Sequence, residues 1–533
     1  MITNPILPGF HPDPSMCRVG DTYYIATSTF EWYPGVRIYR STDLTNWEFC
    51  AAPLDRADLL DMRGNPDSGG VWAPCLSYAD GRFWLVYTDV KRLDGSFKDA
   101  HNYITSCETI DGRWSDRIYV HSYGFDPSLF HDDDGRKWVV TMRWNHRGPG
   151  TGCNPAHDSF DGILLQEWHP ERGLIGEPVN IFAGTPRGLT EAPHLFKRGG
   201  YYYLTTAEGG TGYRHAVTLA RSRDIAGPYE VHPDHHVMSV VDTPDHPIQR
   251  TGHGQYVEAP DGTVWHSFLM GRPIAGPEGK GRFCPLGRES GIERCVWGDD
   301  DWLYLEAGGL LAREHVPSDA EQEPLGPSHY RFDGDSLPDD FQWLRTPETD
   351  RIFRVGGGAL TLIGRESIGS WFEQSLVARR QQHFRYRAET EVDIDPITSQ
   401  HMAGLTTYYN SHKFHALMVG GDGRGGRELA ILSCPGDFPY GELDRSMPAP
   451  VALPDGPVRL AVEVDRATQQ FFYAVEGGDW QAYGPPLDAS QISDEGGKGE
   501  HRSFTGAFVG LASFDTTGMG GEARFPWFSY VPN

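Results

Sequence analysis

Three carboxylates occupy matching places in a pattern that recurs along the chain. Asp13 and Asp126 each begin an Asp-Pro-Ser triplet, and Glu191 stands directly before an Ala-Pro pair that opens another copy. One Asp-Pro-Ser is an ordinary turn-forming sequence, but three acids in register with a repeat predict a shared site. Cleavage of a glycosidic bond uses two carboxyl groups, one protonated and one ionised. A third carboxylate can raise the pKa of the acid by repulsion.

The pattern that carries these acids is a short apolar strand, a Gly- or Asp-containing turn and a strand of alternating aromatic and aliphatic residues. Alternation around a tight turn is typical of a β-hairpin. The five copies are spaced 60, 53, 66 and 62 residues apart and begin at Asp13, Ala73, Asp126, Ala192 and Gly254. A further strand-and-turn motif follows several hairpins, in residues 40–49, 106–116 and 222–231. A period of about 60 residues indicates the blades of a propeller.

The repeat ends after about residue 305, and different strands follow. Residues 314–328 are rich in Pro, Ser and acids, which is typical of a linker. Later strands are longer and lack the blade motif; they are expected at 384–395, 404–410, 457–465, 470–477 and 508–514. We therefore predict an all-β chain with a five-bladed β-propeller over 1–313, a linker over 314–328 and an antiparallel, jelly-roll-like β-sandwich over 329–533. A sandwich throughout would not require five repeats.

The propeller prediction explains why the acids matter. The innermost strand of every blade begins at one mouth of the central channel, so the repeat starts converge there. Asp13, Asp126 and Glu191 would then meet on one axis, where the repulsion between like charges must be compensated.

The stretches around these acids resemble glycoside hydrolase family 43, and in particular its two-domain β-xylosidases. The matching stretches run from residue 4 to about 512 and read NPILPGFHPDPS, VWAPCLSY, YGFDPSLFHDDDG, TEAPHLFKRGGYYYLTTAEGGTG, RTGHGQYVE, LGRES and FTGAFVGL. The resemblance implies a five-bladed propeller that inverts the anomeric centre. It also implies Asp13 as general base, Asp126 as pKa modulator and Glu191 as general acid. An inverting pair stands roughly 6.5–9.5 Å apart, with a water between the two groups.

Four further residues are predicted to bind the sugar. Trp72 directly precedes the second repeat start and so faces the same mouth, and Phe30 lies in STFEW after the first hairpin. The resemblance places both in the wall of the glycone pocket, although either could be ordinary aromatic core. It implies that Arg288 bonds sugar hydroxyls and offsets the carboxylate charge; a surface ion pair is the alternative. Phe504 is our candidate for a second-domain loop that closes the pocket, with the sandwich core as its alternative.

His253 heads the fifth repeat, so its side chain is expected to point into the channel, toward the acids, the substrate or a cation. Relatives in the resembling family differ in holding calcium there, so we require no cofactor and leave Ca²⁺ at His253 open. The histidine-rich run 232–236 is interpreted as an exposed loop. Arg214 stands where the resemblance leads us to expect an acid, which leaves its contacts around the leaving-group subsite open.

The composition excludes some partners. The chain has 533 residues, with 47 Lys and Arg against 73 Asp and Glu, a net charge of −26. Such a chain is repelled by nucleic acids and anionic membranes. It contains no long apolar stretch of membrane-spanning length, and MITNPILPGFHPDPS lacks signal-peptide features. Eight scattered cysteines fit free, mostly buried thiols. We expect a cytoplasmic protein.

These inferences lead to one expectation with named alternatives. The expected activity is an exo-acting β-1,4-xylosidase on xylobiose and short xylo-oligosaccharides, in a homo-oligomer (dimer or tetramer). The first alternative is an α-L-arabinofuranosidase, or both activities in one pocket. An endo-arabinanase would not need a covering domain. A non-catalytic carbohydrate-binding propeller would not need an acid, a base and a modulator at three blade starts.

Overall fold

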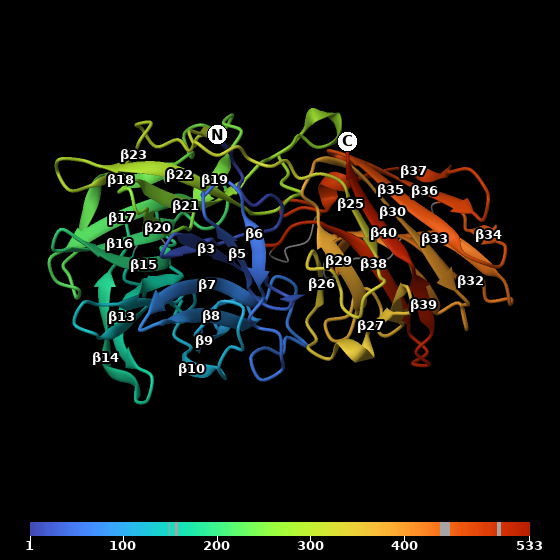
Figure 1. The fold of residues 1–533 in the computed structure, drawn as a ribbon, viewed down its shortest axis with the longest axis horizontal. Helices are drawn as coiled ribbons and strands as arrows, with labels where there is room; N and C mark the ends of the chain where they lie inside the picture. The colour runs from blue at the N-terminus through green and yellow to red at the C-terminus, as the bar shows by residue number, and fades with distance from the viewer. Residues whose placement is uncertain (149, 155–157, 437–447, 498–502) are drawn as a thin grey trace.

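The computed structural model describes residues 1–148, 150–154, 158–436, 448–497 and 503–533. Two β-rich bodies lie side by side, one built by the N-terminal and one by the C-terminal part of the chain (Figure 1). The helical elements of these residues are short 3₁₀ turns, η1 (Pro277–Gly279), η2 (Thr349–Arg351) and η3 (Ala489–Gln491). Within the described ranges, no helix has the length and apolar character needed to cross a membrane.

The N-terminal body is a propeller of five antiparallel sheets, in agreement with the five repeats. Blade I contains β2 (Ser15–Val19), β3 (Thr22–Thr27), β5 (Arg37–Ser41) and β6 (Glu48–Ala51). Blade II contains β7 (Gly70–Ala79), β8 (Arg82–Arg92), β9 (Asp99–Cys107) and β10 (Ile118–His121). Blade III contains β11 (Ser128–His131), β12 (Lys137–Trp144), β13 (Phe160–His169) and β14 (Gly173–Phe182). Blade IV contains β15 (Glu191–Arg198), β16 (Tyr201–Glu208), β17 (Ala216–Ser222) and β18 (Glu230–Ser239). Blade V contains β19 (Gln249–Gly252), β20 (Tyr256–Glu258), β21 (Val264–Gly271), β22 (Glu289–Trp297) and β23 (Leu303–Leu305).

One backbone feature marks the start of every blade. A non-glycine residue with a positive φ, between 33° and 58°, occurs at Asp13, Ala73, Asp126, Ala192 and His253. This left-handed conformation is uncommon for such residues and is often found at functional sites. The fifth blade therefore begins at His253, one residue before the Gly254 that opens its sequence repeat.

The N-terminal segment closes the ring of blades. β1 (Ile2–Thr3) pairs with β24 (His315–Val316), and Leu7 forms an antiparallel bridge with Ser290 of β22. Asn4 donates from Nδ2 to the Ile292 carbonyl (2.9 Å). These bonds join the beginning of the chain to blade V and to β24. They fix the position of the segment that leads to Asp13.

The C-terminal body is a sandwich of two antiparallel sheets. One sheet contains β25 (Ser328–Arg331), β27 (Phe353–Gly356), β28 (Ala359–Ile363), β30 (Arg385–Ile394), β35 (Val458–Asp465), β36 (Thr468–Val475), β37 (Gln481–Asp488), β39 (Glu522–Phe525) and β40 (Trp527–Pro532). The other contains β4 (Trp32–Tyr33), β26 (Phe341–Leu344), β29 (Ser375–Arg380), β31 (His401–Asn410), β32 (Lys413–Gly421), β33 (Arg427–Pro435), β34 (Val451–Leu453) and β38 (Phe508–Asp515). Their apolar faces form one buried cluster, as expected for facing sheets.

The two bodies share a sheet. β4 leaves blade I and pairs with β26, so a propeller segment forms one edge of the sandwich. Trp32 of β4 stacks on Phe508, with ring centroids 3.7 Å apart. The stretch predicted as a linker, 314–328, carries β24 and lies against the propeller, where Thr45 and Ser318 are hydrogen-bonded (2.7 Å). The sandwich therefore has a fixed position at the propeller.

One prediction about a loop is wrong. The run 232–236 lies in β18 and is not an exposed loop. His232 is buried, and its ring lies edge-on to Trp302 and Tyr304, with ring centroids 5.1 and 4.8 Å away. His236 is also buried, and Arg187 Nε donates to its Nε2 (2.8 Å). Only the intervening residues bulge outward, because the register of β17 against β18 shifts there.

Candidate active site

A cavity of about 500 Å³ lies at the propeller mouth, under the edge of the sandwich. All eight residues predicted as site residues line it, namely Asp13, Phe30, Trp72, Asp126, Glu191, His253, Arg288 and Phe504. The geometry therefore gathers acids from blades I, III and IV, as the repeat register predicted. It does not by itself assign their roles.

Asp13 is buried and held as a carboxylate. Ser28 Oγ donates to its Oδ2 (2.6 Å), Arg288 Nη1 donates to its Oδ1 (3.1 Å), and His253 Nδ1 lies 3.5 Å from Oδ1. Burial by itself would raise the pKa of Asp13. The Arg288 charge, with smaller contributions from the histidine and the hydroxyl, outweighs burial and lowers this pKa below its ordinary value.

Asp126 and Glu191 have the opposite electrostatic environment. Asp126 accepts one hydrogen bond, from the Ala192 N–H to Oδ2 (3.1 Å). Burial, followed by repulsion from Glu191 and Asp13, raises the pKa of Asp126 well above its ordinary value. Burial, followed by repulsion from Asp13, raises the pKa of Glu191 to about 8. Two such groups favour a bound proton at neutral pH, so one cavity holds both an ionised and a protonated carboxyl group.

A buried histidine that the sequence reasoning missed stands beside Glu191. His215 Nε2 lies 3.9 Å from Glu191 Oε1, and burial lowers the pKa of His215 to about 3, which keeps the ring neutral. A side chain at Gly252 would place Cβ 2.4 Å from the His215 ring, so this position requires glycine. The run GYRHA gave no reason to choose this histidine.

The described residues contain no group of three or more His, Cys, Asp or Glu side chains placed to hold a metal. His253 instead lies against Asp13. Calcium in the channel stays a prediction.

Aromatic rings form one wall of the cavity. Phe30 and Trp72 lie 5.9 Å apart between centroids, and Phe504 completes the group at 6.4 Å from Phe30 and 5.9 Å from Trp72. Trp72 also packs edge-on against Phe125 (5.2 Å), which in turn contacts Trp144 (5.7 Å). An apolar wall opposite a few polar groups is the usual composition of a small-ligand pocket.

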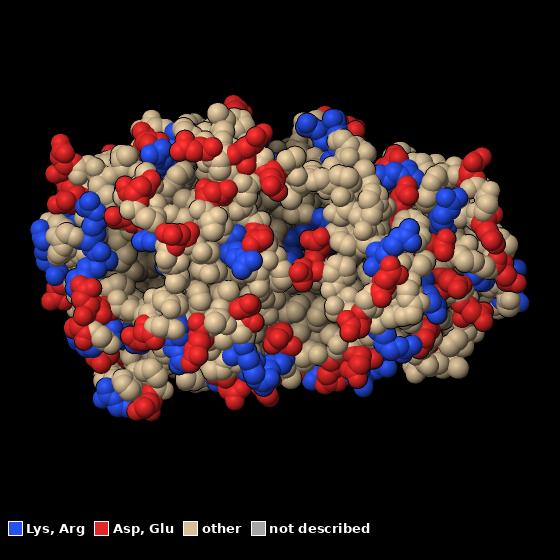
Figure 2. All heavy atoms as spheres, in the orientation of Figure 1, with Lys and Arg blue, Asp and Glu red and all other residues tan. Residues whose placement is uncertain are grey.

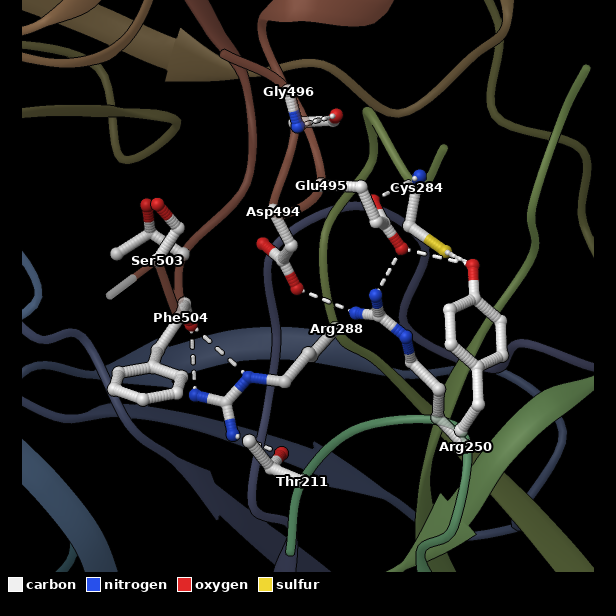
Figure 3. Close-up of polar contacts among 12 residues, drawn as sticks. Thr211, Arg250, Cys284, Arg288, Asp494, Glu495, Gly496, Ser503 and Phe504 are labelled. Atoms are coloured by element: carbon white, nitrogen blue, oxygen red, sulfur yellow. Dashed lines mark hydrogen bonds and ion pairs between the residues drawn. The ribbon is translucent and has the colours of Figure 1, made fainter. Parts of the chain in front are cut away.

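Arg288 connects this wall, the sandwich and the buried carboxylate. Its Nε and Nη2 donate to the Phe504 carbonyl (3.0 and 2.8 Å), while Nη1 donates to Asp13 and to Thr211 Oγ1 (2.9 Å). The guanidinium thus holds the sandwich loop on one side and the Asp13 carboxylate on the other. Figure 3 shows its bonds to Phe504 and Thr211. The N–H of Phe504 is bound by Ser68 Oγ (3.0 Å). Both backbone groups of Phe504 are therefore fixed by the propeller.

A second contact anchors the same part of the sandwich (Figure 3). Arg250, which is 4% exposed, donates to Asp494 Oδ2 (2.5 Å) and to Glu495 Oε1. Glu495 also accepts the Tyr213 hydroxyl (2.8 Å) and the Cys284 N–H (2.8 Å). This buried network joins blade V to residues 494–495. Sequence reasoning missed it because the partners lie 244 and 245 residues apart.

Other lining residues were not predicted. They come from loops within and between the blades, from the end of β12 and from the sandwich loop, and include Lys98, Phe125, Trp144, Ser159, Leu189, Thr211 and Ser503. Phe125 could have been found, because it precedes Asp126 as Trp72 precedes Ala73. Arg214 is exposed and does not line the cavity. The eight cysteines are free thiols, and five of them are buried.

Comparison with known proteins gives consistent matches over the whole chain. Residues 2–303 match "Glycosyl hydrolases family 43", and residues 329–531 match "Beta xylosidase C-terminal Concanavalin A-like domain". The chain is 55% identical to the "Xylosidase/arabinosidase 43B" of Humicola insolens, over all of this chain and 98% of that protein. It is 45% identical to a "Beta-xylosidase" of Bacillus subtilis, over 99% of each. The crystal structure of a xylan beta-1,4-xylosidase from Bacillus halodurans superposes with a TM-score of 0.94 at 46% identity, covering 100% of both chains.

Proposed function

This chain belongs to glycosyl hydrolases family 43, and we propose that it is an inverting, exo-acting β-1,4-xylosidase. It would release D-xylose from the non-reducing end of xylobiose and short xylo-oligosaccharides. The names of its full-length relatives support this substrate class. The observation that carries the mechanism is that one cavity holds Asp13 bonded to Arg288 and Ser28 and holds Glu191 buried without a bonded arginine among the described residues, so that the two pKa values shift in opposite directions.

The proposed reaction is a single displacement. Asp13, held ionised by Arg288 and Ser28, accepts a proton from a water molecule as that water attacks the anomeric carbon. The bond from carbon to the departing oxygen breaks as the new carbon–oxygen bond forms. Glu191 gives its proton to the departing oxygen, so the proton count balances. Burial and repulsion from the ionised Asp13 keep the proton on Glu191 until it is transferred, and Asp126 beside them is the proposed pKa modulator.

The cavity walls support exo action on a pentose. Phe504 and Ser503 of the sandwich line one side of the cavity, where they would block a groove running through the glycone site. Phe30 and Trp72 supply a bulky apolar surface. A xylopyranose has no exocyclic CH₂OH group, so it fits against such a wall more readily than glucose does. The aromatic wall and the covering loop together define a pocket for one terminal sugar.

A second activity, α-L-arabinofuranosidase, is supported by the name of the 55% identical relative. An arabinofuranose can present hydroxyl groups in a pattern similar to those of xylopyranose. Initial rates on 4-nitrophenyl β-D-xylopyranoside and 4-nitrophenyl α-L-arabinofuranoside measure the balance. A higher kcat/KM on the arabinoside would make the second activity the main one.

The direct test is the hydrolysis of 4-nitrophenyl β-D-xylopyranoside, whose only sugar product is the released glycone, followed by ¹H NMR. The proposal predicts that α-D-xylose appears first and then mutarotates. Initial β-D-xylose would exclude inversion, and binding of xylobiose without cleavage after long incubation would support the non-catalytic alternative. The homo-oligomeric state and the cytoplasmic location stay predictions.

A further inference from the structure

A second cavity, of about 360 Å³, lies between the two bodies and apart from the lining of the catalytic cavity. Propeller strands β5 and β6, the stretch 324–328 and sandwich strand β29 contribute its walls. Figure 2 shows a hollow at this junction on the viewed face, with Lys or Arg atoms visible inside it. We call this space the junction cavity.

Three arginines from two domains line the junction cavity. They are Arg37 on β5 and Arg379 and Arg380 at the end of β29, and each is only 4% exposed. Within the described part of the chain, none of the three forms an ion pair. Most arginines that are buried to this extent have a carboxylate partner; Arg288 and Arg250 of this chain each have one.

The hydrogen bonds of these arginines leave donors unused. Arg37 Nε donates to the Tyr39 hydroxyl (2.9 Å), and its guanidinium lies 4.0 Å from the Phe49 ring centroid. Arg380 Nε donates to the Phe10 carbonyl (2.5 Å), while its Nη2 is buried without a partner among the described residues. Neutral acceptors and ring faces satisfy these groups only in part, since each guanidinium carries five N–H donors.

Arg379 has a neutral partner where a charged one would fit. Its Nη2 donates to Gln382 Oε1 (2.5 Å) and its Nη1 to the Tyr330 hydroxyl (2.7 Å). The carboxylate in the cavity lining is Asp340, and it accepts the Tyr330 hydroxyl. The lining therefore combines three arginine charges with one carboxylate charge, within a chain whose net charge is −26.

The pKa values of the two histidines in the cavity also reflect its excess of positive charge. His11 and His383 both line it. Burial, followed by the charges of Arg380 and Arg37, lowers the pKa of His11 well below its ordinary value. Burial and the Arg379 charge lower the pKa of His383. Both rings therefore stay neutral and leave the arginines to define the charge of the cavity.

From this geometry we propose that the junction cavity is a binding site for a small organic or inorganic anion with a carboxylate or phosphate group. Buried charges without a counter-charge are unfavourable. Arginine binds planar carboxylates and phosphates through paired N–H donors. Trp47, Phe49 and Leu325 also line the cavity and offer an apolar surface for the rest of an organic anion.

The bound anion would connect the two bodies. Arg37 belongs to the propeller and Arg380 to the sandwich, and burial together with the Arg37 charge lowers the pKa of Arg380. One anion contacting both would replace this repulsion by two attractive contacts. A ligand that binds only the folded protein stabilises it by RT ln(1 + [L]/Kd), where [L] is the free ligand concentration. Thermal unfolding therefore reports on the site without any assay of activity.

The binding test uses calorimetric titration and the thermal midpoint, Tm, of the full chain. The probes are inorganic phosphate, citrate and D-glucuronate at constant ionic strength, with sodium chloride as the reference. We expect saturable binding of one anion per chain and a rise in Tm with at least one probe. A response to phosphate alone would identify the ligand as a phosphate. A response to citrate or glucuronate alone would identify it as a carboxylate. No saturable response to any probe beyond chloride would overturn the proposal.

Substitutions locate the binding. Arg37→Gln should weaken the binding of the anion that gives a response by about tenfold or more. The matched control is Arg40→Gln, three positions along the same strand, because Arg40 is exposed and already paired with Glu48 (2.6 Å). Arg288→Gln, in the catalytic cavity, should leave binding unchanged. Equal weakening by Arg288→Gln would assign the binding to the catalytic cavity and overturn the proposal.

A variant that is expected to gain stability distinguishes an effect on the proposed site from a general loss of structure. Gln382→Glu places a carboxylate beside Arg379, where the amide oxygen now accepts. We expect a higher Tm without any anion and a smaller Tm rise when the anion is added. A lower Tm together with an undiminished anion response would contradict an unpaired positive charge in the junction cavity. This variant remains informative if Arg37→Gln fails to fold.

Discussion

The catalytic cavity and the junction cavity lie at the same domain boundary but balance their charges in opposite ways. Three carboxylates, Arg288 and Lys98 line the first, whereas three arginines and Asp340 line the second. In the catalytic cavity, the arginine contacts one acid directly, at 3.1 Å, and leaves the other two without such a partner. In the junction cavity, the arginines lie against rings and neutral acceptors.

The difference shows how direct contact decides the state of a buried group. Asp13, in contact with Arg288, keeps a lowered pKa despite burial. Asp126 and Glu191, without such contact, have raised pKa values. In the junction cavity, an arginine cannot relieve its charge as readily by losing a proton. The remaining way to balance that charge is a bound anion.

One segment connects the two regions. Pro8 and His11 line the junction cavity, and Asp13, two residues further on, lines the catalytic cavity. Arg380 binds the Phe10 carbonyl in this segment, and the His11 N–H donates to the Arg288 carbonyl (3.0 Å). The position of the proposed base therefore depends on residues from both cavities.

The largest expected effect comes from removing the ionised group of the catalytic cavity. Asp13→Asn keeps the shape of the side chain but cannot accept the proton of the attacking water. We expect kcat on xylobiose to fall by about 10³- to 10⁴-fold, measured by xylose release with Tm as the folding control. A loss of less than about tenfold would assign the base to another residue.

Removing the protonated group should give a loss that depends on the substrate. Glu191→Ala should lower kcat on xylobiose by about 10²- to 10³-fold. It should lower kcat much less on aryl xylosides whose leaving groups depart without a proton. Rates on a series of aryl xylosides with different leaving-group pKa values measure this. Equal losses on all substrates would count against an acid role for Glu191.

A weaker effect is expected from the anchor of the covering loop. Arg250→Gln leaves Asp494 and Glu495 without their cation and should loosen residues 503–504 over the sugar. We predict a fall in kcat/KM of about tenfold, because small misplacements reduce catalysis. Arg282→Gln is the matched control, since Arg282 also stacks on Tyr213 (3.9 Å) but, among the described residues, pairs with no acid. A similar loss in both variants would show that the Arg250 ion pairs do not position the covering loop.

The smallest effect tests the junction cavity. Gln382→Glu should raise the free energy of unfolding by about 1 kcal/mol, which is typical of a hydrogen-bonded charge pair. Urea unfolding in buffer without phosphate or carboxylates measures it. A decrease would mean that the charge of the cavity is already balanced.

Most of the site residues that could be predicted were found from the repeat. Asp13, Asp126 and His253 were found because they share a blade position, and Glu191 because it stands one residue away. Residues in loops within a blade, such as Lys98 between β8 and β9, follow no repeat. Contacts across the domain boundary, such as Arg250 with Asp494, depend on how two folded bodies meet. The five-bladed propeller and the sandwich were therefore predictable, but the loop anchor and the junction cavity were not.

The run 232–236 shows a further limit of local patterns. A Pro-Asp pair among histidines resembles a loop, yet the flanking His232 and His236 are buried by partners from other strands. Only the three-dimensional register between β17 and β18 places the bulge between them.

The pH dependence of kcat/KM on an aryl xyloside tests the central claim most directly, since it reports the ionisation of the free enzyme. Asp13 must be ionised, so activity should fall on the acidic side only below the usual aspartate pKa. Glu191 must be protonated, so activity should fall as the pH rises through about 8. The account predicts that Glu191→Ala removes the alkaline limb and keeps the acidic one. An alkaline limb that is unchanged in Glu191→Ala would contradict it.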